Sequence, residues 1–278
     1  MTALKNATAV ITGAGSGIGR ASAHAMAARG ARVVVADIDG DAAERVAEEI
    51  ASSGGQAAAV VCDVTAEHAH AELGEFAVDR FGRVDVVMNN VGVLTSGRPD
   101  HLPVSEWQRI IDTNLMSVVR SNAVFLPVLM RQGRGHIVNT ASFAGLFSYS
   151  YDRLPYAATK AAIVQMSEGL RLYLQPRGIG VTVVCPGPVA TNILSSMPPT
   201  FGPPVKTGLP GEQSRFLRRK WSARRSSMRS STTHSWSSHT RRSSKCWWTA
   251  LRTGKGFWPG RSLHSGTDRS NRCRSGQP

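Results

Sequence analysis

The sequence predicts an α/β fold with a doubly wound parallel sheet, because two regular features run through its first 211 residues. Short β-branched runs alternate with longer amphipathic runs, which is typical of βαβ units. Gly30, Gly54, Gly82 and Gly178 each follow an amphipathic run and can end its helix before the next strand. Since crossovers between parallel strands are right-handed, we expect helices on both faces and ligands beyond the carboxyl ends of the strands.

The apolar pattern gives the order of the elements. Strands are predicted near residues 7–11, 31–36, 57–61, 84–88, 135–140 and 179–184. Helices are predicted near residues 17–29, 39–53, 66–81, 105–131 and 156–176. Ser105 is expected to cap the fourth of these helices through its hydroxyl.

The turn between the first strand and the first helix, Thr12–Gly19, is rich in glycine. A helix that begins there leaves its first N–H groups unpaired, and their dipole attracts a phosphate. Gly13 permits the tight turn, Gly17 lets a pyrophosphate approach the backbone, and Gly19 lets the helix pack close to the strand. Taken alone, the pattern also fits a plain loop. The cofactor-binding residues predicted in this turn are Gly13, Ser16, Gly17, Ile18 and Gly19.

An acidic residue after the second strand favours the nucleotide interpretation. Asp37 lies 20 residues after Gly17, where a carboxylate accepts hydrogen bonds from an adenosine ribose. Together the two features predict a Rossmann-type domain that binds a dinucleotide. Four further strand ends carry unusual residues and outline a cleft, namely Asp63-Val64, Asn89–Gly92, Ser142 and Pro186–Thr191.

Tyr156 and Lys160 are the predicted chemical centre, because residues four apart on a helix share a face. Such a pair is also common on plain surfaces, but its place 14 residues after Ser142 favours a pocket. A phenol that acts as a base near neutral pH needs a pKa lowered by about 3 units, or about 4 kcal/mol. A cation about 4 Å away supplies a similar amount before desolvation is subtracted, and an oxidised nicotinamide would complete the shift.

Two other polar residues belong to the predicted centre. Ser142 would hydrogen-bond the substrate oxygen, although a serine at a strand end can also satisfy the backbone. Asn114 lies in an otherwise apolar helix, where a buried amide needs a partner. It either bonds a neighbouring carbonyl or holds water in a proton path from Lys160, and we favour the second interpretation.

In this order the residues resemble the motifs of the short-chain dehydrogenase/reductase family over residues 4–205. The motifs are TGxxxGxG at Thr12–Gly19, NNxG at Asn89–Gly92, YxxxK at Tyr156–Lys160 and PGxVxT at Pro186–Thr191. The resemblance implies a catalytic tetrad of Asn114, Ser142, Tyr156 and Lys160. In it Tyr156 is the acid/base, Lys160 binds the nicotinamide ribose and lowers the tyrosine pKa, and Ser142 polarises the substrate. Further cofactor contacts are implied at Asp63, Val64, Asn90, Gly92, Pro186, Gly187, Val189 and Thr191. Of these, Val189 and Thr191 would hold the carboxamide.

The resemblance also implies NAD(H) rather than NADP(H). Asp37 would repel a 2′-phosphate, and the glycine-rich turn carries no basic residue before Arg20. Val91 departs from the alanine usual in the family and would crowd the adenosine site slightly. A homodimer or homotetramer is expected from the family, but the basic C-terminal part of this chain, residues 212–278, argues against the tetramer.

Composition limits the class of protein. No apolar run reaches the roughly 18 residues of a membrane span, and no secretory signal is recognisable at the N-terminus, so we expect a cytoplasmic protein. The cysteines, Cys62, Cys185, Cys246 and Cys273, have no CxxC spacing, which argues for reduced thiols and against a metal site.

The net charge of +14 is confined to one part of the chain. Residues 1–211 hold 17 basic and 17 acidic side chains, whereas residues 212–278 hold 16 basic and 2 acidic ones. We therefore divide the chain into a catalytic domain, 1–211, and a basic tail, 212–278. The last part of the domain, 188–211, is rich in Pro and Gly and is expected to cover a hydrophobic alcohol or ketone. The apolar residues expected near that substrate are Leu94, Leu146, Phe147, Ile193, Leu194, Met197 and Phe201.

The tail admits three interpretations: a nucleic-acid-binding segment, a disordered tail, or a translation of the wrong reading frame. The genetic code favours the third. Most Ser codons and those of Trp and Cys begin with U, and moving the frame back by one base places each U in the middle position, which is typical of apolar residues. Residues 235–258 can then encode a buried strand, a turn and an amphipathic helix. We hypothesise a frameshift near residue 211. The alternative to an active oxidoreductase is an inactive relative of the family, or a module that binds nucleic acid through the tail.

Overall fold

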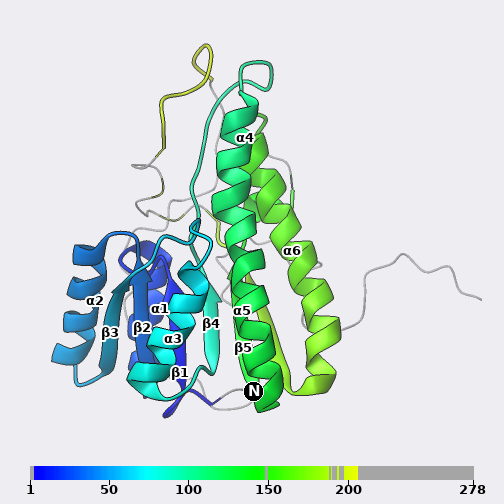
Figure 1. Cartoon of the computed structure of the whole chain (residues 1–278). Helices are drawn as coiled ribbons and strands as arrows, with labels where there is room; N and C mark the ends of the chain where they lie inside the picture. Colours follow the sequence, from blue (N-terminus) through cyan, green and yellow to red (C-terminus); the bar gives the residue numbers. More distant parts are fainter. Residues whose placement is uncertain (1–2, 148–149, 188, 190–192, 194–196, 206–278) are drawn as a thin grey trace, which may run out of the picture. The chain divides into compact units, whose positions relative to one another are not determined.

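The computed structural model of the chain describes residues 3–147, 150–187, 189, 193 and 197–205. Within them six parallel strands form one sheet in the order β3-β2-β1-β4-β5-β6 (Figure 1). The strands are β1 Thr8–Thr12, β2 Arg32–Asp37, β3 Gln56–Val61, β4 Val86–Asn89, β5 Gly135–Thr140 and β6 Ile179–Val184. The strand order reverses between β1 and β4, and in such a sheet ligands bind at the carboxyl ends beside this reversal. The predicted doubly wound fold is confirmed.

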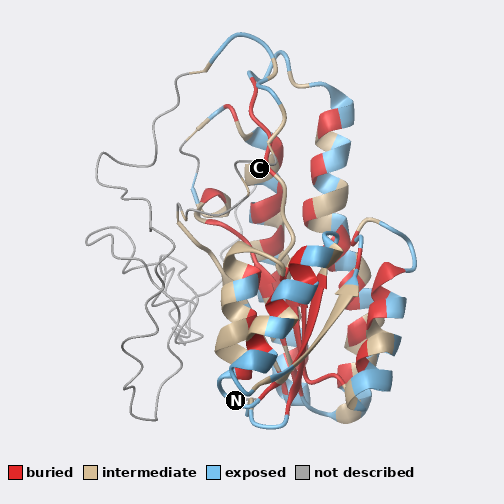
Figure 2. Ribbon diagram, turned by 90° about the vertical axis from the view of Figure 1, so that its left-hand side faces the viewer, coloured by how far each residue is buried: buried red, intermediate tan, exposed pale blue. Residues whose placement is uncertain are grey.

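Helices cover both faces of the sheet. They are α1 Gly17–Ala27, α2 Gly40–Ser52, α3 Ala69–Phe81, α4 Val104–Ile111, α5 Ser117–Gln132 and α6 Leu154–Leu174. The apolar sides of α1 and α2 pack on one face of the sheet, and those of α3, α5 and α6 pack on the other. Figure 2 shows the result, with buried residues on the sheet and on the inner sides of the helices. The strands β1 and β4, next to the reversal, are buried throughout.

The helix predicted over residues 105–131 is longer and less regular than expected. It consists of α4, a π-helical turn at Asp112–Met116 and α5, which follow one another without a break. The prediction that Ser105 caps this helix is wrong, because α4 begins at Val104 after Pro103. Proline suits the start of a helix since it has no N–H to leave unpaired. The π turn places Asn114 inside the helix bundle with no exposed surface.

The edge of the sheet at β6 is less covered than its centre. Among the described residues, the face that carries α1 and α2 leaves Thr182 of β6 exposed, with its hydroxyl 2.8 Å from the ring of His136 on β5. Within the described residues, this side of β6 is therefore less buried than β1 and β4.

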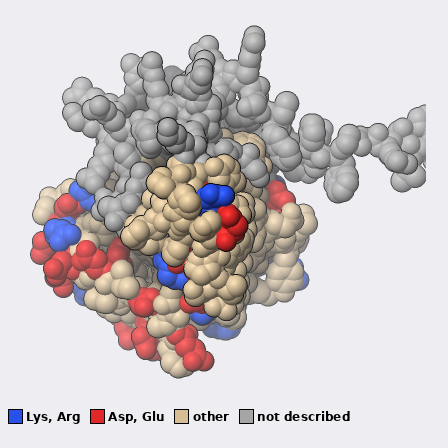
Figure 3. All heavy atoms as spheres, turned by 90° about the horizontal axis from the view of Figure 1, so that it is seen from above, with Lys and Arg blue, Asp and Glu red and all other residues tan. Residues whose placement is uncertain are grey.

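Side chains of both charges occur over the described surface seen from above in Figure 3. The basic tail, residues 212–278, lies outside the described residues, as does most of the predicted cover, 188–211. Among the described helices, none has the length and apolar character that a membrane crossing requires.

Candidate active site

The glycine-rich turn has the geometry that its glycines predict. Gly13 and Gly17 adopt φ values of +62° and +53°, in the left-handed region that favours glycine. A Cβ on Gly19 would lie 2.1 Å from the carbonyl oxygen of Gly13, so this position admits no side chain. The loop therefore brings bare backbone to the N-terminus of α1, as a pyrophosphate requires. Ser16 and Ile18 flank Gly17 and are partly exposed.

Asp37 lies at the end of β2, and its carboxylate is bonded to this turn. Its Oδ2 accepts the N–H of Gly15 at 2.8 Å, and its Oδ1 accepts the N–H of Asp39 at 3.1 Å. The sequence did not single out Gly15, where a Cβ would lie 2.7 Å from the Cβ of Ala42. Each carboxylate oxygen can still accept a second hydrogen bond. Asp37 thus fits the place of a ribose acceptor.

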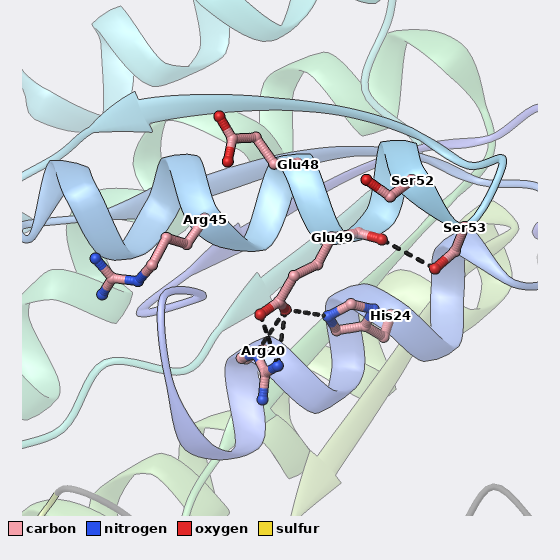
Figure 4. A pocket seen from close by; sticks show the side chains of 7 residues that line it. All are labelled: Arg20, His24, Arg45, Glu48, Glu49, Ser52 and Ser53. Carbon is pink, nitrogen blue, oxygen red and sulfur yellow. Dashed lines mark hydrogen bonds and ion pairs between the residues drawn. The ribbon is translucent and has the colours of Figure 1, made fainter.

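The nearest basic side chain after the turn is already paired. Arg20 donates two hydrogen bonds to Glu49 on α2, at 2.9 and 2.8 Å, and the ring of His24 lies 2.9 Å from the same carboxylate (Figure 4). Partial burial opposes ionisation of Glu49, but the hydrogen bonds from His24 and Arg20 hold its pKa below the ordinary value. These three residues help to line a hollow formed by α1 and α2, in which the charge of Arg20 is paired with that of Glu49.

Asp63, one of the cofactor contacts that the family resemblance implies, is hydrogen-bonded within its own turn. The Oδ1 of Asp63 accepts the backbone N–H and the hydroxyl of Thr65, at 2.9 and 2.7 Å. These bonds keep the pKa of Asp63 below its usual range. Its neighbour Val64 is buried in the core and supplies an apolar surface.

Asn90 ties together three strand ends. Its side-chain amide donates to the carbonyls of Thr12 and Gly13, at 3.3 and 3.1 Å, and its oxygen accepts the hydroxyl of Thr140 at 3.2 Å. The carboxyl ends of β1, β4 and β5 are thereby held at one place. Asn90 thereby holds the start of the glycine-rich turn against the ends of β4 and β5.

Lys160 and Tyr156 lie together on α6. The Nζ of Lys160 is 5.8 Å from the centroid of the Tyr156 ring, and it donates to the carbonyl of Thr140 at 2.8 Å. The lysine is 2% exposed, and burial lowers its pKa from 10.5 to about 8. A Cβ on Gly92 would lie 3.2 Å from this Nζ, so a glycine there leaves room beside the ammonium. The tyrosine is half-buried.

Asn114 bonds the backbone of the loop that follows β4. Its oxygen accepts the N–H of Val93 at 2.7 Å, and its amide donates to the carbonyl of Val93 at 2.9 Å and to the hydroxyl of Thr159 at 3.4 Å. The structure thus has the local bonding that was the less favoured interpretation. Both amide hydrogens are engaged, and a water path from Lys160 stays a prediction.

Ser142 follows β5, and its Oγ accepts the N–H of Ala144 at 3.1 Å. This bond leaves the hydroxyl hydrogen to be donated elsewhere. Pro186 lies beside this serine, because its carbonyl accepts the N–H of Phe143 at 3.0 Å. Gly187 and Val189 are partly buried, whereas Thr191 lies outside the described residues.

Comparison with known proteins agrees with this arrangement. A family model described as short chain dehydrogenase matches residues 7–200. The 1-deoxy-11-beta-hydroxypentalenate dehydrogenase of Streptomyces exfoliatus is 38% identical over 197 residues, which cover 70% of this chain and 71% of that protein.

Two solved structures are also similar. A short chain dehydrogenase/reductase from Burkholderia phymatum in complex with NAD has a TM-score of 0.68 at 35% identity, over 70% of each chain. A 7α-hydroxysteroid dehydrogenase complexed with NADH and 7-oxo glycochenodeoxycholic acid has a TM-score of 0.66 at 35% identity, over 69% of this chain and 75% of that one.

The parallel sheet and the glycine-rich turn define a nucleotide-binding α/β protein. The match over residues 7–200 makes the family definite: the chain belongs to the short-chain dehydrogenase/reductase family. It is an oxidoreductase that uses a nicotinamide cofactor.

Proposed function

We propose that this protein interconverts a hydrophobic secondary alcohol and its ketone, with NAD as cofactor and Tyr156 as the acid/base. The observation that supports it most is the buried ammonium of Lys160 beside the Tyr156 ring, at the end of a sheet whose first turn fits a pyrophosphate. The nicotinamide would accept the hydride from the alcohol carbon or return it to the ketone.

Each member of the tetrad would have a distinct task. The charge of Lys160 stabilises the phenolate form of Tyr156, which takes the proton from the alcohol or returns it. Ser142 donates its hydroxyl hydrogen to the substrate oxygen. This hydrogen is available because the Oγ of Ser142 acts as the acceptor toward the N–H of Ala144. Asn114 fixes Val93, next to the glycine that faces Lys160.

NAD is proposed over NADP on electrostatic grounds. A 2′-phosphate would lie where Asp37 accepts backbone hydrogen bonds, and two negative charges there repel each other. Arg20, the first cation after the turn, is neutralised by Glu49.

Apolar side chains favour a hydrophobic substrate. Leu94 is buried at the start of the β4–α4 loop, and the rings of Phe143 and Phe147 pack edge to face at 4.4 Å just after Ser142. The names of the relative and of one structural neighbour specify hydroxylated compounds, a hydroxypentalenate and a hydroxysteroid. Leu194 lies outside the described residues, whereas Ile193, Met197 and Phe201 are partly buried.

We further propose that residues 1–211 form the catalytic domain, with 188–211 over the substrate, and that the reading frame changes near residue 211. The family match ends at residue 200, before the position at which we place the change of frame. Sequencing the coding DNA tests this idea, and stop codons in the preceding frame would refute it. A cytoplasmic location and a homo-oligomer are part of the proposal, and nucleic acid is not a proposed partner.

Turnover in the Tyr156→Phe variant tests the proposed function. The full chain is screened with NAD and secondary alcohols, and NADH binding is followed by fluorescence. We expect the variant to lose at least a hundredfold in kcat while it binds NADH as the wild type does, because only the proton-transfer group is removed. Equal turnover in the two proteins would refute the role of Tyr156.

A further inference from the structure

A buried carboxylate outside the tetrad lies just before the catalytic helix. Asp152 is 2% exposed and lies four residues before Tyr156. Its Oδ2 accepts the hydroxyl of Ser96 at 3.0 Å, and Arg153 lies 3.7 Å from the same oxygen. Its other oxygen accepts the hydroxyl of Ser150. A charge this deeply buried is costly unless it is bonded, and these contacts supply the bonds.

Asp152 also holds the loop between β4 and α4 through its backbone. Its carbonyl accepts the N–H of Gly97 at 2.9 Å, so both its side chain and its main chain bond to adjacent residues of that loop. The same loop is bound to Asn114 at Val93, three residues earlier. The residues 93–97 are therefore fixed at one end by the tetrad and at the other by Asp152.

The same short stretch pairs with a described part of the segment that we expect over the substrate. The N–H of Phe201 donates to the carbonyl of Ser96 at 2.9 Å, and the N–H of Arg98 donates to the carbonyl of Phe201 at 3.2 Å. Gly97 permits this approach, because a Cβ there would lie 2.7 Å from the Cβ of Phe201. The position of Phe201 is thus set by residues that Asp152 holds.

We propose that Asp152 is a positioning residue that sets the affinity for the substrate. Through Ser96 and Gly97 it places Phe201, one of the apolar residues expected around a hydrophobic alcohol or ketone. The contacts described for the glycine-rich turn and for Asp37 are made by other residues, so we expect cofactor binding to stay unchanged when Asp152 is replaced. This inference rests on the proposed function.

Two variants of the full chain test it: Asp152→Asn, which removes the charge, and Ser96→Ala, which removes one hydrogen bond. Each should raise KM for the ketone about tenfold, because the hydrogen bond between Ser96 and the carboxylate of Asp152 is weakened in the first variant and lost in the second. The kcat and the dissociation constant of NADH should stay within about twofold. Because the two side chains share one bond, the double variant should be no worse than the more affected single variant.

Asp100→Asn is the matched control, because Asp100 follows in the same loop but is largely exposed, with only surface partners in Arg98 and His101. It should leave KM unchanged. If the two test variants lower kcat or weaken NADH binding while KM stays constant, the proposal is overturned.

Amide hydrogen exchange separates this inference from the proposed function. The N–H groups of Gly97, Arg98 and Phe201 should exchange at least about tenfold faster in Asp152→Asn than in the wild type, whereas those of β1 should not change. If the wild type shows no turnover, faster exchange still supports the coupling while the proposed function fails. Unchanged exchange at these three amides overturns the coupling itself.

Discussion

Replacing Lys160 with methionine should stabilise the protein and abolish its activity. The ammonium is fully buried in the native state, whereas methionine has a similar length and no charge. Burial lowers the lysine pKa from 10.5 to about 8, so its charged form is less favourable in the folded protein than in the unfolded chain. The residue that we propose to activate Tyr156 therefore weakens the fold.

The size of the effect follows from the pKa. At about 1.4 kcal/mol for each pH unit, keeping the ammonium charged below pH 8 costs about 3 kcal/mol of unfolding free energy. The hydrogen bond to the carbonyl of Thr140 returns about 1 kcal/mol. We therefore expect Lys160→Met to be about 2 kcal/mol more stable than the wild type at pH 7.

The sign of the pH dependence can also be predicted. Between pH 8 and 10.5 the unfolded wild type holds a proton on Lys160 that the folded protein has lost, so the wild-type stability rises with pH in this window. The methionine variant lacks this gain. Its advantage should shrink by about 2 to 3 kcal/mol between pH 7 and pH 10.

Urea denaturation of both proteins at the two pH values measures these differences. Other titrating groups are the same in both proteins and cancel in the comparison. A variant that is less stable at pH 7, or an advantage that does not change with pH, would refute the assigned burial of the charge.

Three other changes have outcomes fixed by the structure. In Gly169→Ala on α6, the added Cβ lies more than 4 Å from any described heavy atom outside the helix, so the free energy of unfolding should rise by about 0.5 to 1 kcal/mol without a change in turnover. A lower free energy of unfolding would contradict a helical residue with open space around it. Asp37→Asn keeps the shape of the side chain but removes its charge, and the ratio of kcat/KM for NADP to that for NAD should rise at least about tenfold. A constant ratio would show that Asp37 does not select the cofactor. Cys62 and Cys185 should resist iodoacetamide at pH 8, because burial raises the pKa of each thiol to about 11; peptide mass spectrometry checks this, and rapid alkylation of the native protein would contradict it.

The strands could be predicted from the sequence because a parallel sheet buries both its faces. Continuous apolar runs such as 33–36 mark the strands that are buried on both faces, as β2 is over these residues. The ends of helices were harder to predict. The helix expected from residue 66 begins at Ala69, because residues 63–66 form a turn instead. In this turn the carbonyl of Asp63 accepts the N–H of Ala66, and its carboxylate accepts the N–H of Thr65.

The features that the sequence could not give depend on contacts between distant segments. The π turn contains Asn114, which bonds Val93, 21 residues earlier in the chain. Asp152 and Ser96 are 56 residues apart, and nothing in the local pattern marks either of them. By contrast, Tyr156 and Lys160 are four apart on one helix, so their proximity follows from helical geometry alone.

Titration of the full chain with NADH tests the central claim most directly. Nicotinamide fluorescence should show saturable binding to the wild type, and Gly19→Ala should abolish it, because the added Cβ would displace the backbone of the glycine-rich turn. Absence of binding to the wild type, or equal binding to both proteins, would contradict a dinucleotide site at the start of α1.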